Sequence, residues 1–156
     1  MSYLDLVNSE MEKSGEEPAY AGEAREEIIE AFEKKLNLKF PPSYKAFLKR
    51  FGALSFAGDT YYGITKDGLD SKSVPCVAFA TQKARFQNDA DDNMVVIKAS
   101  GYGPIYSIDT SIVDSNGESP IIETELSFKR DKEKITVSPS FEEFFTQSIQ
   151  DAIEEL

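Results

Sequence analysis

The side chains that most often carry out chemistry in proteins are scarce in this sequence. It contains no histidine, which removes the commonest general base and the commonest metal ligand. Cys76 is its only cysteine, so an intrachain disulfide and a zinc site built from several cysteines are both excluded. As a nucleophile Cys76 would lack an imidazole partner, and the run 74–79 around it is typical of a buried strand. A structural thiol is the better interpretation.

Two short motifs resemble ligand-binding loops but lack the residues that the ligands need. The run Asn88–Asn93 is rich in aspartate, yet Asn93 and Ala99 stand where a calcium loop needs glycine and glutamate. The run Gly101–Pro104 lacks the further glycine and the lysine of a phosphate loop, and Pro104 removes a backbone donor. We interpret the first as a solvated turn and the second as part of a hairpin.

Paired carboxylates on one helix are the remaining candidates for acid–base work. Glu26, Glu30 and Glu33 are predicted to lie opposite the apolar side of their helix, where we expect them to face water. No set of residues suited to catalysis remains. The sequence therefore predicts a protein that is not an enzyme, with no catalytic residue, no cofactor and no metal site.

Apolar residues at helical spacing predict four main helices. The first is a short N-terminal helix that ends before Gly15, and the second runs from about Gly22 to Asn37. The third begins at Pro41-Pro42 and ends at Gly52, and the last begins at Ser140 with the pattern of a capping box. In the third helix one face carries four large side chains that we expect to be buried against the sheet: Tyr44, Phe47, Leu48 and Phe51.

Between the third and the last helix the pattern changes to that of short strands. Thr81 is expected to cap a short helix that reaches Phe86, and residues 100–103 are expected to connect a hairpin. The predicted strands are 60–64, 76–79, 94–97, 103–109, 120–122 and 134–137. Turn-linked short strands next to helices predict a single α+β domain over residues 1–156, with a mainly antiparallel sheet flanked by helices.

The charge limits the choice of partner. The net charge is −11, which argues against direct binding of nucleic acid because phosphates repel carboxylates. It favours a basic protein partner, or serves solubility alone. The first residues lack a positively charged leader and no apolar run approaches the length of a membrane span, so we expect a cytoplasmic protein that does not enter the membrane.

Three stretches resemble the SUKH superfamily. Phe32–Gly52 is similar to its signature of a helix ending in Leu-Gly, then Leu-Pro-x-x-Tyr-x-x-Phe-Leu, then Asn-Gly. Gly103–Asp109 resembles its Gly-Asp-x-Tyr-x-Leu-Asp hairpin strand, and Ser140–Phe145 its terminal helix. The sequence departs from this pattern by Asn37 for glycine, Phe51 for asparagine and Pro104 for aspartate. Residues 22–156 would form the SUKH-like core, and residues 1–21 an extra N-terminal helix and loop.

The resemblance implies an α+β fold without catalytic residues. Bacterial members of the superfamily are largely immunity proteins that neutralise polymorphic toxins, often nucleases, and fungal members are linked to cell-wall signalling. The main hypothesis is thus an immunity protein, or antitoxin, that covers the basic active site of a cognate toxin nuclease encoded nearby. A non-catalytic regulatory or adaptor domain with the same fold is the alternative, and a small enzyme would need a polar pocket.

Six residues are predicted to contact this partner: Asp59, Tyr61, Tyr62, Asp89, Asp91 and Asp92. The aspartates fall in predicted loops beside strand ends, where recognition residues are commonly presented. The tyrosines would supply the apolar anchors that charge alone lacks. Alternatively the aspartates only solvate turns, and strand alternation places at least one of the two tyrosines in the core.

Overall fold

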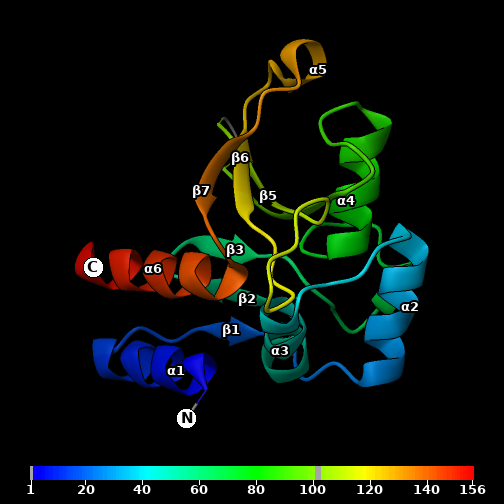
Figure 1. Ribbon diagram of the computed structural model, residues 1–156. Coiled ribbons are helices and arrows are strands. Elements are labelled where there is room, and N and C mark those ends of the chain that lie inside the picture. The colour runs from blue at the N-terminus through cyan, green and yellow to red at the C-terminus, as the bar shows by residue number, and fades with distance from the viewer. Residues whose placement is uncertain (1, 101–102) are drawn as a thin grey trace.

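The computed structural model describes residues 2–100 and 103–156, and its helices include all four of the main predicted ones (Figure 1). These are α1 (Tyr3–Ser14), α2 (Glu26–Leu36), α3 (Pro42–Phe51) and α6 (Phe141–Glu154). The predicted C-terminal ends of α2 and α3 are confirmed as well. Asn37 ends α2 with a φ of 57°, and Gly52 ends α3 with a φ of 73°. At the start of α6 the Ser140 hydroxyl accepts a hydrogen bond from the Glu143 N–H.

The strands form two antiparallel sheets, which confirms the predicted α+β class. One sheet has the order β1 (Ala19–Tyr20), β2 (Leu54–Phe56), β3 (Asp59–Tyr61). The other has the order β4 (Met94–Ala99), β5 (Ile105–Asp109), β6 (Ile121–Thr124), β7 (Ile135–Ser138). The Tyr62 N–H donates to the Ile97 carbonyl at 2.8 Å and so ties the two sheets together. The predicted hairpin connection at 100–103 includes Gly101 and Tyr102, which lie outside the described residues.

The four large side chains of α3 are all buried, as their spacing predicts. Tyr44 and Phe47 pack against aromatic rings of α6, and Phe47 lies 5.2 Å from both Phe141 and Phe145. Tyr44 adds an edge-to-face contact with Phe141 at 5.0 Å. The centre of the core is therefore this junction of α3 and α6.

The N-terminal helix α1 packs beside α6 (Figure 1). It buries one side completely, through Leu4, Val7 and Met11. Polar contacts hold its first turns on α3, because the Tyr3 hydroxyl donates to the Ser43 carbonyl and Asp5 pairs with Arg50. The apolar side of α1 is thus an integral part of the hydrophobic core.

The prediction of a strand around Cys76 is wrong. Cys76 is the N-cap residue of α4 (Val77–Phe86), and its thiol is buried as expected of a structural cysteine. The buried positions of this segment include 77, 80, 81 and 84, which is helical spacing. A short apolar run of this length has the same appearance in a buried strand and in a buried helix, so its sequence alone misleads.

Two further side chains differ from the sequence-based expectation. Thr81 lies inside α4 rather than at its start, and its hydroxyl accepts a hydrogen bond from the Val96 N–H of β4 at 3.0 Å. Glu33 is buried instead of facing water, because its carboxylate accepts a 2.7 Å hydrogen bond from the Phe40 N–H. In both cases a backbone N–H from outside the helix provides the hydrogen-bond partner that compensates for burial. The structure also contains the short helices η1 (Gly68–Asp70) and α5 (Phe128–Asp131).

Candidate partner-binding groove

A groove lies between the face of the four-stranded sheet and α6. Its floor is a row of side chains on neighbouring strands, since Lys98 of β4 is directly opposite Tyr106 of β5, which is opposite Glu123 of β6. Val137 of β7 extends the floor to the end of the sheet. The strand register therefore fixes the order of these groups across the groove.

One side of α6 forms the wall of the groove. Phe144 packs on Tyr106 with 5.5 Å between the ring centres, which joins the wall to the floor. The hollow has a volume of about 630 Å³. The polar side chains that the helix contributes are Glu142, Glu143, Thr146, Gln147, Ser148 and Asp151. We call the set of Lys98, Tyr106, Glu123, Val137, Phe144 and these six polar α6 residues the acidic groove.

The groove has a net negative charge. Four carboxylates line it, and Lys98 is the one cation among its lining residues. Lys98 is itself 3.7 Å from Asp59 and lies over the rings of Tyr61 and Tyr106, at 5.1 and 5.9 Å. These contacts offset its charge, so the carboxylates dominate the field in the groove.

The tyrosine on the floor responds to this field. Burial and then the carboxylates of Glu123 and Glu125 raise the pKa of Tyr106 to about 12. The phenol therefore stays neutral near pH 7. It offers the groove an aromatic surface and a hydroxyl group, and it carries no charge there. A surface of this kind suits a cationic ligand with apolar parts.

Three of the six residues predicted to bind a partner lie at one end of this region. Asp59 pairs with Lys98 of the groove, and Tyr61 lies under the same ammonium group. Tyr62 follows directly and lines a separate hollow beside β3. Tyr61 is 1% exposed and Tyr62 is 8% exposed, so strand alternation did not separate a buried tyrosine from an exposed one. Tyr61 supports the groove through its contact with Lys98, and the contact of both tyrosines with a partner remains a prediction.

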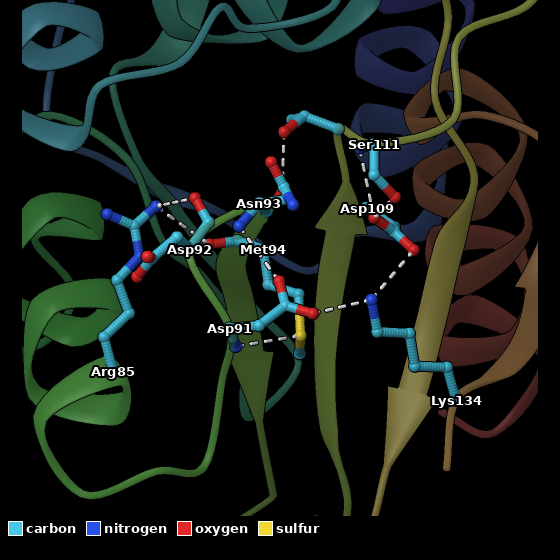
Figure 2. A network of polar contacts seen from close by, with 9 residues as sticks. Arg85, Asp91, Asp92, Asn93, Met94, Asp109, Ser111 and Lys134 are labelled. Atoms are coloured by element: carbon cyan, nitrogen blue, oxygen red, sulfur yellow. Dashed lines mark hydrogen bonds and ion pairs between the residues drawn. The ribbon is translucent and has the colours of Figure 1, made fainter. Parts of the chain in front are cut away.

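The other three aspartates lie at the opposite end of β4, in the loop that leads into it. Figure 2 shows two of them, Asp91 and Asp92. Asp91 pairs with Lys134 at 2.7 Å, and Lys134 also reaches the buried Asp109 at 3.3 Å. Asp89 pairs with Lys129 at 3.6 Å. The Asp92 backbone carbonyl accepts a hydrogen bond from Arg85. These contacts hold the loop, the end of β5 and the segment before β7 together, so Asp91 has a structural role.

Sequence reasoning missed most of the acidic groove. In the sequence, Glu142 and Glu143 belong to the capping-box pattern at the start of the last helix, and Tyr106 belongs to the family motif Gly103–Asp109. No motif in the sequence distinguishes Glu123 or Lys98. The strand pattern is the feature of the sequence from which the floor of the groove could be found, because the correct strand register aligns Lys98, Tyr106 and Glu123. The position of α6 over them depends on tertiary packing.

The Asp91–Lys134–Asp109 contacts predict a measurable difference between two lysines. Replacing Lys134 with methionine should lower the free energy of unfolding by about 1.5–3 kcal/mol, because it leaves the buried Asp109 without its ammonium partner. The matched change Lys129→Met removes a more exposed pair and should cost less than about 1 kcal/mol. Urea unfolding of both variants makes the comparison. Equal losses would contradict a structural role for Lys134.

The same contacts predict a pH dependence. Burial raises the pKa of Asp91, but the Lys134 hydrogen bond and the Asn93 N–H outweigh it, so the net pKa is lowered. A carboxyl group with a lowered folded-state pKa stabilises the protein above its unfolded pKa and loses this effect as the pH falls through the folded value. Between about pH 5 and about pH 3, the Asp91→Asn variant should therefore lose less stability than the wild type. Parallel slopes in urea midpoints would contradict this.

Within residues 2–100 and 103–156, no group of three or more Cys, Asp or Glu side chains is placed to hold a metal ion. In the same part of the chain, no helix is both long enough and apolar enough to cross a membrane.

The fold defines a small α+β domain with an acidic groove between its four-stranded sheet and α6. Residues 26–145, about three quarters of the chain, match the family model SUKH_6, described as SMI1-KNR4 cell-wall. The chain belongs to this SUKH family. Its members are generally non-catalytic immunity or binding proteins, and the family as a whole implies a protein partner. The helix α1 precedes the matched residues.

Proposed function

We propose that this protein is an immunity protein that binds a cognate toxin, with a nuclease as the expected target, and blocks its basic active site. The acidic groove carries this proposal. It places Glu123, Glu142, Glu143 and Asp151 around one hollow of a chain whose net charge is −11. A nuclease must present lysine and arginine side chains to phosphates, so its active site is complementary to such a surface.

Electrostatics would act mainly on the speed of recognition. Clustered carboxylates attract a cationic partner over distances set by the Debye length and so raise the association rate. The apolar part of the groove would supply contact area, through Tyr106, Val137 and Phe144. The combination of carboxylates on the α6 wall with an aromatic and apolar surface beside them is typical of protein–protein recognition.

The six residues predicted from the sequence take unequal parts in this proposal. Asp59 is half-exposed next to Lys98, so it extends the acidic groove at the β3 end. Asp89, Asp91 and Asp92 would form a second, separate contact area, in addition to the ion pairs that Asp89 and Asp91 already make. Tyr61 and Tyr62 would act by supporting Lys98 and the β3 end.

A regulatory or adaptor domain is the second candidate function. The observation that favours it is the family description, SMI1-KNR4 cell-wall, which names a non-toxin setting for related proteins. Such a domain would use the same groove on a basic segment of a regulatory partner. The division of the chain into residues 1–21 and a core of 22–156 is likewise a proposal, and it places α1 outside the shared part of the fold.

Co-expression with the protein encoded next to it tests the proposed function. A tagged copy of this chain should retain that neighbour through affinity purification, and it should restore the growth of cells that the neighbour alone kills. A matched experiment with a toxin from an unrelated pair should show neither effect. Retention without protection would favour the adaptor function, and absence of both effects would contradict the immunity function.

A further inference from the structure

The strand β7 ends the four-stranded sheet and has a neighbour on one side only. Among the residues that the structure describes, it pairs with β6 and with no other strand. The first three of its four residues, Ile135, Thr136 and Val137, are all exposed, although side chains alternate between the two faces of a strand. Both faces of this part of β7, as well as its outer edge, are therefore open.

This edge has no charge and no proline within the strand, which are two of the usual protections against pairing, although β7 is short and its pairing with β6 has a register shift between Ile121 and Ile122. Exposed edge strands normally carry a charge or a proline within them, because free N–H and C=O groups recruit other strands. Here Ile135 is 47% exposed and Val137 is 44% exposed, and both are β-branched residues that favour extended structure. Charge and proline occur only outside the strand, at Lys134 and Pro139. The segment has the properties of a docking edge.

The charge next to the edge defines what can dock there. Val137 belongs to the floor of the acidic groove, so the groove is continuous with β7. A strand added along β7 would point every second side chain toward the sheet face that carries Tyr106 and Glu123, near the first turn of α6. Glu142 and Glu143 are exposed in that turn. Cationic side chains at alternate positions would meet these carboxylates.

We infer that β7 binds an extended segment of the partner as a fifth strand, with lysine or arginine side chains at alternate positions directed into the acidic groove. Backbone hydrogen bonds along β7 would supply affinity, and the carboxylates would select a basic sequence. The inference deepens the proposed function and rests on it only for the identity of the partner.

A second copy of the chain fits this edge less well. Pairing β7 with β7 in an antiparallel arrangement would bring two acidic grooves together, each lined by four carboxylates and one lysine. Two chains with a net charge of −11 also repel each other at a distance. The charge therefore favours a basic segment of another protein over self-association.

The first test uses a synthetic probe in place of the unidentified partner. The probe is a peptide of about seven residues in which lysine and valine alternate. It should bind the full chain and slow the hydrogen exchange of amides 135–138. Binding should weaken as salt increases. Two control peptides, one with glutamate in place of lysine and one N-methylated on alternate amides, should bind at least about tenfold more weakly.

Variants of the chain locate the binding. Ile135→Lys combined with Val137→Lys should weaken peptide binding about tenfold, because lysine on an edge blocks pairing and repels the probe. The matched pair Ile112→Lys and Val113→Lys changes two apolar residues that are also exposed, and it should have no effect. Thermal unfolding of both double variants checks that each is folded.

Several results would overturn the inference. These are failure of the lysine–valine peptide to bind, equal binding of the N-methylated peptide, or protection of amides elsewhere but not at 135–138. Sedimentation that shows a dimer with β7 already protected would identify a second copy as the occupant.

Binding of the toxin encoded by the neighbouring gene distinguishes failure of this inference from failure of the proposed function. A toxin bound equally by the Ile135→Lys/Val137→Lys variant would overturn strand addition alone, and a bound peptide without a bound toxin would contradict the immunity function alone.

Discussion

Replacing Phe47 with alanine is expected to lower the free energy of unfolding by roughly 3–5 kcal/mol. Phe47 is fully buried, and its ring centre lies 5.2 Å from the ring centres of both Phe141 and Phe145. Its loss removes contacts between α3 and α6 and leaves a cavity that the surrounding rings fill only in part. Urea denaturation followed by circular dichroism measures the change.

The same substitution at Phe86 is the matched control. Phe86 is the last residue of α4 and is 89% exposed, so Phe86→Ala should change the free energy of unfolding by no more than about 0.5 kcal/mol. If Phe47→Ala unfolds at the wild-type midpoint, the junction of α3 and α6 is not the centre of the core. A large loss in both variants would point to a general effect of removing aromatic rings.

Removing charge from the acidic groove should slow recognition of the partner markedly. The triple change Glu142→Gln, Glu143→Gln and Asp151→Asn keeps the shape of these exposed α6 side chains and removes three negative charges. At low salt the association rate with the neighbour-encoded toxin should fall roughly tenfold, with a smaller change in dissociation. Stopped-flow or surface-binding kinetics separate the two rates.

A second triple variant removes equal charge from another surface. Glu23, Glu27 and Glu30 are exposed in or just before α2, and their replacement by glutamine should slow association much less. Near 0.5 M salt, where the Debye length is only about 4 Å, the two variants and the wild type should converge. Equal slowing by both triple variants would show that net charge steers the partner and that the acidic groove does not.

The fold could be predicted where one face of an element carries a strong periodic signal. In α3, Pro42 lies at the start, Gly52 lies at the end, and Tyr44, Phe47, Leu48 and Phe51 share the buried face, so local sequence and tertiary packing agree. In α4 the local sequence does not indicate the helix that tertiary packing produces. Its buried side chains are small, and the partners that decide its conformation come from β4, as in the Thr81–Val96 hydrogen bond.

The acidic groove could not be predicted because its residues are brought together by register and packing. Lys98, Tyr106 and Glu123 come from three strands, and only the observed pairing aligns them. The aspartates of the loop before β4 gave a stronger sequence signal, since three of them fall within four residues. The structure assigns Asp91 to an ion-pair network instead, because the lysine that meets it lies 43 residues further along the chain.

The packing of α1 beside α6 has a consequence for protein synthesis. Gln150 of α6 donates a hydrogen bond to Glu10 of α1 across 140 residues of chain. At about 5–20 residues per second, a ribosome needs roughly 7–30 s to make that interval. During this time the apolar side of α1 has no α6 to cover it, so the nascent chain exposes Leu4, Val7 and Met11. A chaperone that binds such apolar segments should therefore associate with ribosome-bound chains until α6 emerges.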